Sequence, residues 1–566
     1  MTGPDHLATG LLGGALLGVS SHLAIFIRGE WHMRTILLVT TYSVLAAGLC
    51  FAEYYHLQDF SAAIKATGLL LASYFTGLFT SIVIYRLYFH RLRHFPGPSG
   101  AAVSKFWHVW KCFERSNHLV VHDLYKRYGP IIRTGPEELT IVDPSILSLL
   151  DGPKSQFTKA PWYDIFLPDV SINATRDVAA HDARRRIWDR GFSPKAMSVY
   201  EERLEEYAHL LAAQIHKLAD EGTLDNGKKS KNDAVINVTE WMSWFAFDLM
   251  GEFAFARSFR MLQDKKWHSR LKLLVDAMGM MDTVSPVPWL AQFALSLRPR
   301  LHLSKNWAAM MRWCKECMDE RLQLPGEHPD VSQWLIDASR KTNPPFADRA
   351  WLDGDAVTII VAGSGTVSVA LVFAFYELAL HTEQQAKLFE ELREVDIYDR
   401  VQLRNCAHLN AVIHETLRLH PPIPTGGYRV TPPEGATINL ASDGKSHYIP
   451  GGVTVVAPRY SIQRLETSYR DAADFVPERW TTRKEEMTLD PRGFGPFAMG
   501  RYGCIGRALA MSEMRLVIAI LVKRFVIGFA DEVDKGEEMM TGLKDTFTFA
   551  PGNLWLRFRL RSGGGE

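Results

Sequence analysis

Residues 497–506, FAMGRYGCIG, place one cysteine between glycines. They precede RALAMSEMRLVIAILVKRF, a run whose apolar residues recur at helical intervals. A helix starting near Gly506 would aim unpaired amides and the positive end of its dipole at the Cys504 sulfur, which favours the thiolate. Gly500, Gly503 and Gly506 allow a tight turn and leave room for a flat ligand. The stretch predicts a metal-binding thiolate beside a large planar cofactor; alone, it also fits a buried structural thiol.

Composition sets bounds on the protein that carries this stretch. The 566 residues, 47% of them hydrophobic, suffice for one large domain or two ordinary ones. The 64 lysines and arginines nearly balance 63 acidic residues, so net charge gives no reason to expect a nucleic-acid partner. Six sparse cysteines suit a reducing compartment better than a disulfide framework. We expect most of the chain to lie in the cytosol.

Three apolar runs, at 7–27, 35–52 and 66–89, distinguish the start of the chain. Each reaches the roughly 17–25 residues that a helix needs to cross a bilayer. The runs repeat and lead into the basic segment YRLYFHRLRH, whereas a cleaved signal peptide has one shorter apolar core. They predict a membrane anchor over residues 1–94 with about three transmembrane helices. Alternatively, the first run lies in the membrane interface.

Basic residues set the expected orientation of this anchor. Arg28 and Arg34 lie between the first two runs, and Arg86 lies at the end of the third, before Arg91 and Arg93. By the positive-inside rule both positions are cytosolic and the N-terminus is lumenal. We therefore expect a multi-pass protein of the endoplasmic reticulum membrane, with lipid as a partner. Its cytosolic domain, residues 95–566, begins at the helix-breaking segment FPGPSG.

The soluble part has the pattern of a mainly α domain with a minor β-sheet. Short strand patterns, GPIIRTGPEELTIVD and GGVTVVAP, are few and bounded by glycine and proline. No internal repeat or second strong linker interrupts this part, so a single large domain is expected. Helical spacing of apolar residues covers 183–218, 237–259, 307–324, 353–380, 383–395, 403–419 and 505–526.

Further segments connect the thiolate loop to a family. HETLRLHPP contains Glu415 and Arg418, FVPERW contains Arg479, and VAGSGTVSVAL (361–371) lies on a long apolar helical pattern. In order and approximate spacing, these segments and FAMGRYGCIG resemble the cytochrome P450 monooxygenases, most of all the microsomal fungal members of secondary metabolism. The resemblance extends over nearly the whole chain. It implies the cytochrome P450 fold, a heme-binding catalytic domain and a heme b whose iron is bound by the Cys504 thiolate.

The resemblance also implies roles for two groups of residues. Glu415, Arg418 and Arg479 would form a buried structural triad that holds the heme-side loops. From the sequence alone, the first two are also consistent with an exposed helical pair worth about 0.2–1 kcal/mol. Thr366 would position protons at bound dioxygen. Ser364 or Ser368 with water would replace the acid that the family usually has immediately before this threonine. The competing interpretation of Thr366 is a helical threonine that bonds its own backbone.

Two positions depart from the family pattern. The heme loop usually has a basic residue two positions before the cysteine, here Tyr502, and the oxygen-binding helix has an acid immediately before its threonine, here Gly365. The Tyr502 hydroxyl can hydrogen-bond a heme propionate but supplies no charge. Neutralisation of the propionate charge then depends on cationic residues other than the one at this position. The expected heme contacts are Cys504, Phe497, Gly500, Arg501, Tyr502 and Gly506, with His181 and Arg185 from HDARRRIWDRGFSP and Arg429 from the strand after the helix that carries Glu415 and Arg418. From the sequence alone, Arg429 is equally consistent with a surface arginine.

The implied reaction inserts one oxygen atom from dioxygen into an apolar substrate, by hydroxylation or epoxidation. The aromatic loop APWYDIFLPDV suggests a polycyclic guest, and core packing of the same rings is equally consistent with the sequence. Two alternatives remain: desaturation, oxidative coupling or rearrangement without oxygen insertion, and a heme-bearing membrane binding or sensor protein. The expected pocket residues are Trp162, Tyr163, Phe166, Val361, Gly365, Thr425 and Phe547.

The electron supply follows from a missing motif. The sequence contains neither a GxGxxG dinucleotide-binding loop nor a flavin domain. Electrons are therefore expected from NADPH through a membrane-bound NADPH-cytochrome P450 reductase. Cytochrome b5 is a further candidate donor.

Overall fold

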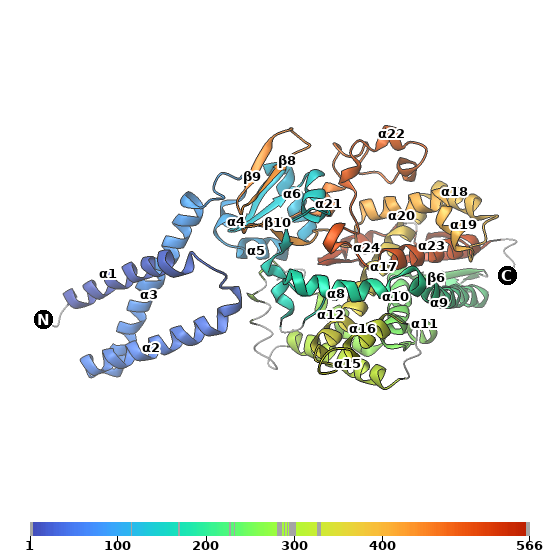
Figure 1. Cartoon of the computed structure of the whole chain (residues 1–566). Helices are drawn as coiled ribbons and strands as arrows, with labels where there is room; N and C mark the ends of the chain where they lie inside the picture. The colour runs from blue at the N-terminus through green and yellow to red at the C-terminus, as the bar shows by residue number, and fades with distance from the viewer. Residues whose placement is uncertain are drawn as a thin grey trace.

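The computed structural model has a helical arm and a larger body (Figure 1). It describes residues 4–561 except 115, 168–169, 226–227, 231, 280–285, 288, 291–292, 294–301, 325–329 and 532. The arm consists of α1 (Pro4–Ser21), α2 (Thr35–Leu57) and α3 (Phe60–Ile84), extended by the π-helical turns η1 (His22–Phe26) and η3 (Tyr85–Phe89). Asp59 caps α3 by accepting hydrogen bonds from two amides, so this helix starts earlier than its apolar run.

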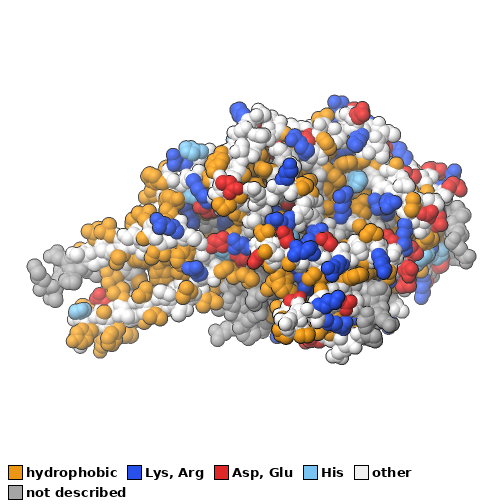
Figure 2. All heavy atoms as spheres, in the orientation of Figure 1, with side chains coloured by type: hydrophobic (Ala, Val, Ile, Leu, Met, Phe, Trp, Pro, Cys, Tyr) orange, Lys and Arg blue, Asp and Glu red, His pale blue; other side chains and the backbone are white. Residues whose placement is uncertain are grey.

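Glycines bring α1 and α3 into close contact. A Cβ atom at Gly18 would lie 2.1 Å from the Tyr74 carbonyl oxygen, and one at Gly77 would lie 2.1 Å from that of Ala15. Small residues commonly allow membrane helices to approach each other this closely. Hydrophobic side chains cover the outside of the arm (Figure 2). The arm therefore has the packing and the surface of a membrane anchor.

Four described helical segments are long and apolar enough to cross a membrane. Three of them form the arm. The fourth, α17 (Arg349–Leu380), lies mostly buried in the body and is the helix expected over 353–380. Three candidate spans therefore remain, as the sequence predicts.

Helices form most of the body, with α17 at its centre (Figure 1). Close packing against α10 (Val238–Phe255) depends on Gly363, where a Cβ would lie 2.3 Å from the Met250 sulfur. The other helices are α4 (Ser99–Val103), α5 (Phe106–Glu114), α6 (Asn117–Tyr128), α7 (Ser145–Asp151), α8 (Val178–Gly191), α9 (Pro194–Glu221), α11 (Met261–Asp264), α12 (Ser269–Met278), α15 (His302–Gln323), α16 (Val331–Arg340), α18 (Thr382–Leu392), α19 (Arg400–Asn405), α20 (Ala407–Leu419), α21 (Arg459–Ile462), α22 (Lys484–Met487), α23 (Arg507–Arg524) and α24 (Glu537–Thr541).

The prediction of one helix over 183–218 is wrong, because the chain forms α8 and α9 there. Pro194 occupies the first turn of α9, where its missing amide hydrogen costs nothing, whereas inside a helix it would break the hydrogen-bond ladder. The Ser193 side chain caps the new helix by accepting from the Ala196 amide at 3.4 Å. The Ser193-Pro194 pair is the sequence signal for the start of a new helix here.

A five-stranded sheet of order β1-β2-β10-β7-β3 lies on the arm side of the body (Figure 1). The two strand patterns of the sequence form β1 (Ile131–Gly135), β2 (Glu138–Ile141) and β10 (Thr454–Val456). In β7 (Tyr428–Val430), Arg429 pairs with Val455 of β10 and with Lys159 of β3 (Thr158–Lys159). The remaining strands are β4 (Thr223–Asp225), β5 (Lys228–Ser230), β6 (Asp233–Asn237), β8 (Ala436–Asn439), β9 (Ser446–Ile449), β11 (Phe525–Phe529), β12 (Lys544–Thr546), β13 (Thr548–Ala550) and β14 (Trp555–Leu560).

One buried carboxylate links α20 to the turn η5 (Pro477–Trp480). The Glu415 oxygens accept hydrogen bonds from Arg418 at 2.8 and 2.9 Å, and from Arg479 at 3.0 Å. The three side chains are fully buried. Other guanidinium N–H groups of this triad donate to backbone carbonyls of Gln463, Ala472, Asp474, Arg470 and Asp471.

Replacing Glu415 by glutamine should severely destabilise the body. The amide leaves two buried guanidinium groups without a counter-charge, which costs about 3–5 kcal/mol of a domain stability of about 5–15 kcal/mol. Thermal unfolding of the detergent-solubilised protein measures the loss. The control is Glu486→Gln, which removes an exposed partner of Arg483 and should leave the unfolding temperature close to the parental value. Equal unfolding temperatures for Glu415→Gln and the parent would contradict the structural role of the triad.

Candidate active site

Cys504 lies just before the N-terminus of α23. Its amide donates to the Phe497 carbonyl at 2.8 Å and so closes the loop. The Cys504 side chain is accessible to solvent. The surrounding protein still removes enough water from the thiol to raise its pKa. Hydrogen bonding by the Gly506 and Arg507 amides and the nearby Arg185 and Arg507 charges lower this pKa. The thiol is thus accessible to a ligand, and its helix-terminal donors favour the anion that metal binding requires.

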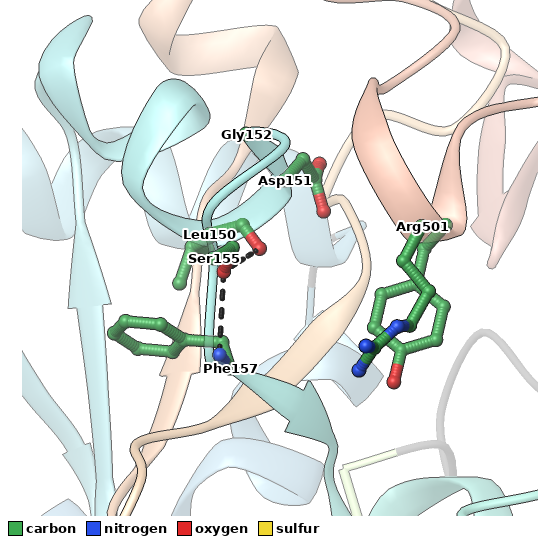
Figure 3. Close-up of a pocket in the computed structure, with 7 residues that line it drawn as sticks. Leu150, Asp151, Gly152, Ser155, Phe157 and Arg501 are labelled. Atoms are coloured by element: carbon green, nitrogen blue, oxygen red, sulfur yellow. Dashed lines mark hydrogen bonds between the residues drawn. The ribbon is translucent and has the colours of Figure 1, made fainter. Parts of the chain in front are cut away.

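Gly500 brings this loop against the end of α7. Its φ of +62° belongs to the left-handed region, and a Cβ atom would lie 2.4 Å from the Asp151 carbonyl oxygen. Figure 3 shows Arg501 across a small pocket from this end of α7. The wall of that pocket is held by Ser155, whose hydroxyl donates to the Leu150 carbonyl at 2.7 Å and accepts from the Phe157 amide at 3.2 Å.

Three buried cations lie close together beside the loop, and two of them share one carboxylate. Arg429 and Arg459 each donate to Asp151 at 3.0 Å, and the strand register places Lys159 directly opposite Arg429. Like charges opposite each other in a sheet are destabilising unless an anion joins them. The Arg429 Nε atom, moreover, has no hydrogen-bond partner among the described residues. The cluster therefore carries uncompensated positive charge.

Lys159 was not singled out by the sequence analysis. Its ammonium donates to the Ile172 and Asn173 carbonyls, each at 2.7 Å, and forms no ion pair with a carboxylate of the described residues. Burial, and secondarily the Arg429 charge, lower the pKa of Lys159 to about 7. The only local signal was a lysine inside the apolar run FTKAPWY.

Tyr502 lies among these charges. The Arg429 guanidinium carbon is 4.5 Å from the centre of its ring, and the Lys159 ammonium is 5.4 Å from it. The His181 ring packs edge-on against Tyr502 at 4.9 Å. The place that is basic in the family pattern thus holds a tyrosine ring that cations from the strands β3 and β7 approach.

Two other expected heme contacts bind protein groups. Arg185 donates to the Gly503 carbonyl at 2.7 Å and to Asp189 at 2.8 Å, so it supports the backbone of the loop. Arg501 pairs with Asp182 at 3.3 Å, with both side chains partly exposed. The structure therefore places the more deeply buried cations at Lys159 and Arg429 rather than at Arg185 or Arg501.

These donors fit a heme. Its iron takes a thiolate, which Cys504 offers beside a helix N-terminus. Its two propionates are anions, which the excess charge of Lys159, Arg429 and Arg459 would neutralise. Phe497, partly buried, packs against the main hydrophobic core of the body, and Gly506 leaves open space next to the sulfur.

One face of α17 is open in the middle of the buried helix. Ala362 is exposed, Thr366 is half-buried, and a Cβ atom at Gly365 would meet nothing within 4 Å. Residues three and four apart share a helix face, so these positions border the same space. The Thr366 hydroxyl donates to the Ala362 carbonyl at 2.7 Å. Ser364 is fully buried, its hydroxyl has no described partner, and it lies about 200° around the helix from Thr366.

The aromatic residues expected in the pocket are largely packed. Trp162 stacks between Tyr428 and Phe547, with ring centres 4.9 Å from each. The Tyr163 hydroxyl accepts from Arg429 at 3.4 Å. This arrangement agrees with the core-packing interpretation for Trp162. Of the other expected pocket residues, Thr425 is buried, Val361 packs against the core, and the Phe166 side chain lies outside the described part.

Comparison with known proteins decides the family. The cytochrome P450 family model matches residues 96–554. The chain is a member of the cytochrome P450 family. This P450 is 36% identical to the cytochrome P450 monooxygenase FCK2 of Fusarium pseudograminearum over 97% of each chain. It is 34% identical to tryprostatin B 6-hydroxylase of Aspergillus fumigatus over 94% of this chain and 93% of that protein.

The fold agrees with solved P450 structures. The crystal structure of the cytochrome P450DA heme domain matches this chain with a TM-score of 0.63 and 18% sequence identity. The match covers 93% of that chain and 79% of this one. The family and fold confirm the expected enzyme class, a heme-thiolate oxidoreductase, and the expected cofactor, heme with an axial cysteine thiolate. Electrons from NADPH through a reductase are typical of such enzymes.

Replacing Gly500 by alanine should prevent stable heme loading. The methyl group would overlap the Asp151 carbonyl, and the left-handed backbone adds about 1–3 kcal/mol of strain. Heme content per purified protein measures the effect. Gly528→Ala is the matched control, because its Cβ would meet nothing within 4 Å and its φ is not positive, so heme content should stay at the parental value. Parental heme content in both variants would contradict the close approach of Gly500 to the Asp151 carbonyl.

Proposed function

We propose that this P450 inserts one oxygen atom from dioxygen into an apolar, polycyclic secondary metabolite, by hydroxylation or epoxidation. The observation that carries this proposal is the relationship to fungal monooxygenases over almost the entire chain, one of which is named as a hydroxylase of tryprostatin B. The open face of α17 supports it, because a planar group and a guest need room beside Gly365. Bound heme supplies the activation of dioxygen.

Cys504 would hold the iron of a heme, and the cation cluster would hold its propionates. The amides at the start of α23 favour the thiolate, and Arg185 fixes the loop through the Gly503 carbonyl. Lys159 and Arg429 would each gain a carboxylate partner. These residues would therefore hold the planar group beside the loop.

Thr366 positions protons on the open face of α17. Its hydroxyl can leave the Ala362 carbonyl and donate to an ordered water on this open face. Gly365 carries no acid, and Ser364 lies on the opposite side of the helix. Protons therefore reach Thr366 through water rather than through a neighbouring carboxylate.

The catalytic body, residues 95–566, lies at the cytosolic face of the endoplasmic reticulum, anchored by α1, α2 and α3. The connector between α1 and α2 contacts the body, which supports an orientation with both on one side of the membrane. NADPH-cytochrome P450 reductase supplies electrons, and its acidic surface docks near the exposed Arg507.

The glycine at 365 favours one second candidate on the same fold. Without an acid beside Thr366, proton delivery is weaker, and desaturation, oxidative coupling or rearrangement without oxygen insertion competes. This candidate keeps Cys504 and the cation cluster unchanged. It differs only in the fate of the oxygen atoms.

Product analysis in isotope-labelled dioxygen tests the proposal. Substrates are first found by their shift of the heme spectrum on purified protein, then turned over with reductase and NADPH. The proposal predicts one labelled oxygen atom per product molecule. Product without label would favour the second candidate, and ligand binding without any NADPH consumption would indicate a binding or sensor protein.

The same assay tests Thr366. Thr366→Ala should lower product per NADPH consumed on the order of 10²-fold, because the group that positions protons is lost. Thr358→Ala is the matched control, since Thr358 makes the same bond to its own helix, to the Gly354 carbonyl at 3.0 Å, two turns away. The control should retain parental coupling. Equal coupling in both variants would assign Thr366 to the helix backbone alone.

A further inference from the structure

The connector between α1 and α2 forms an ionic cluster with the body. Arg176 donates to both Glu30 oxygens at 2.8 and 2.9 Å, and to the Asp164 carboxylate at 2.7 Å. The His32 Nε2 atom lies 2.7 Å from the same Asp164 oxygen. Two residues of the membrane arm thus contact two residues of the body.

The two body residues belong to segments that border the candidate active site. Asp164 lies in η4 (Pro161–Phe166), directly after Trp162 and Tyr163. Arg176 stands two residues before α8, the helix that carries His181 and Arg185. A displacement of the connector would therefore reach both the aromatic loop and the helix beside the heme loop.

A metal ion is not needed to explain the cluster. One ligand atom each from Glu30, His32 and Asp164 lie within 4.8 Å of one another, as in a cation site. The Arg176 guanidinium already supplies the cation, because it bonds both carboxylates. It also holds the pKa of Glu30 below its ordinary value through their hydrogen bond.

The body side of this cluster is more buried than an ordinary surface ion pair. The Asp164 side chain is 13% exposed and that of Arg176 is 30% exposed, whereas Glu30 in the connector is 51% exposed. By contrast, the Arg257–Glu320 pair, at 2.8 Å, is 49% and 66% exposed. Partly desolvated, two-pronged contacts of arginine are worth more than exposed single contacts.

We propose that Glu30 and His32 form a brace through which the membrane anchor positions η4, with Arg176 as the positioning residue between them. The arm then does more than attach the body to lipid: it fixes one wall of the space beside the heme. The statement that η4 borders the guest rests on the proposed function. The brace itself rests only on the four side chains.

Hydrogen exchange of the full-length, heme-loaded protein in lipid nanodiscs tests the brace. Tyr163 and Leu167 donate backbone hydrogen bonds within η4, to Ala160 and Asp164, each at 3.1 Å. Glu30→Ala should make the amides of this segment exchange roughly tenfold faster, the scale of one lost charge-assisted hydrogen bond. Exchange in α23 and the carbon-monoxide spectrum should not change.

Two further variants complete the test. Glu320→Ala removes the exposed pair and should leave exchange in η4 at the parental rate. Arg176→Lys keeps the charge but loses the two-pronged contact, so exchange should fall between the parent and Glu30→Ala. Parental exchange in Glu30→Ala would overturn the brace. Because the measurement needs no substrate, faster exchange in a protein that oxidises nothing would uphold the brace and refute the proposed function.

Discussion

The geometry of the site depends on the contact between Gly500 and the end of α7. It forces the loop into a conformation that only glycine adopts without strain, and thereby leaves the Cys504 sulfur open in front of α23. The bond from Arg185 to the Gly503 carbonyl holds the same loop from the side of α8. The Glu415 carboxylate fixes the neighbouring η5 segment. Each device restrains backbone, so the thiol itself remains available.

Charge explains why this body suits a dianionic, planar cofactor. Lys159 and Arg429 lie opposite each other on the neighbouring strands β3 and β7. The Asp151 carboxylate is shared between Arg429 and Arg459. Buried charges are costly unless they are paired. A ligand that brings two carboxylates relieves that cost and stabilises the folded state by mass action. In the proposed function, heme binding and folding would be coupled through these cations as well as through the thiolate.

Local sequence patterns predicted the anchor, α17, the thiolate loop and the Glu415–Arg418 neighbours, because each depends on residues close in the chain. The Lys159–Arg429 pairing could not be predicted, since strand register joins segments far apart in sequence. The environment of Trp162 was equally undecidable, because Tyr428 and Phe547 come from distant segments. Two local signals in the sequence indicate the observed arrangement. Pro194 divides α8 from α9, and helical periodicity places Ser364 on the opposite side of α17 from Thr366.

The most direct test of the account is the carbon-monoxide difference spectrum of the reduced, purified protein and of Cys504→Ala. The account predicts the signature of thiolate-ligated ferrous heme in the parent and its absence in the variant, because Cys504 is the only cysteine in the loop that precedes α23. A parent without that signature, or a variant that keeps it, would contradict the claim that Cys504 holds the iron.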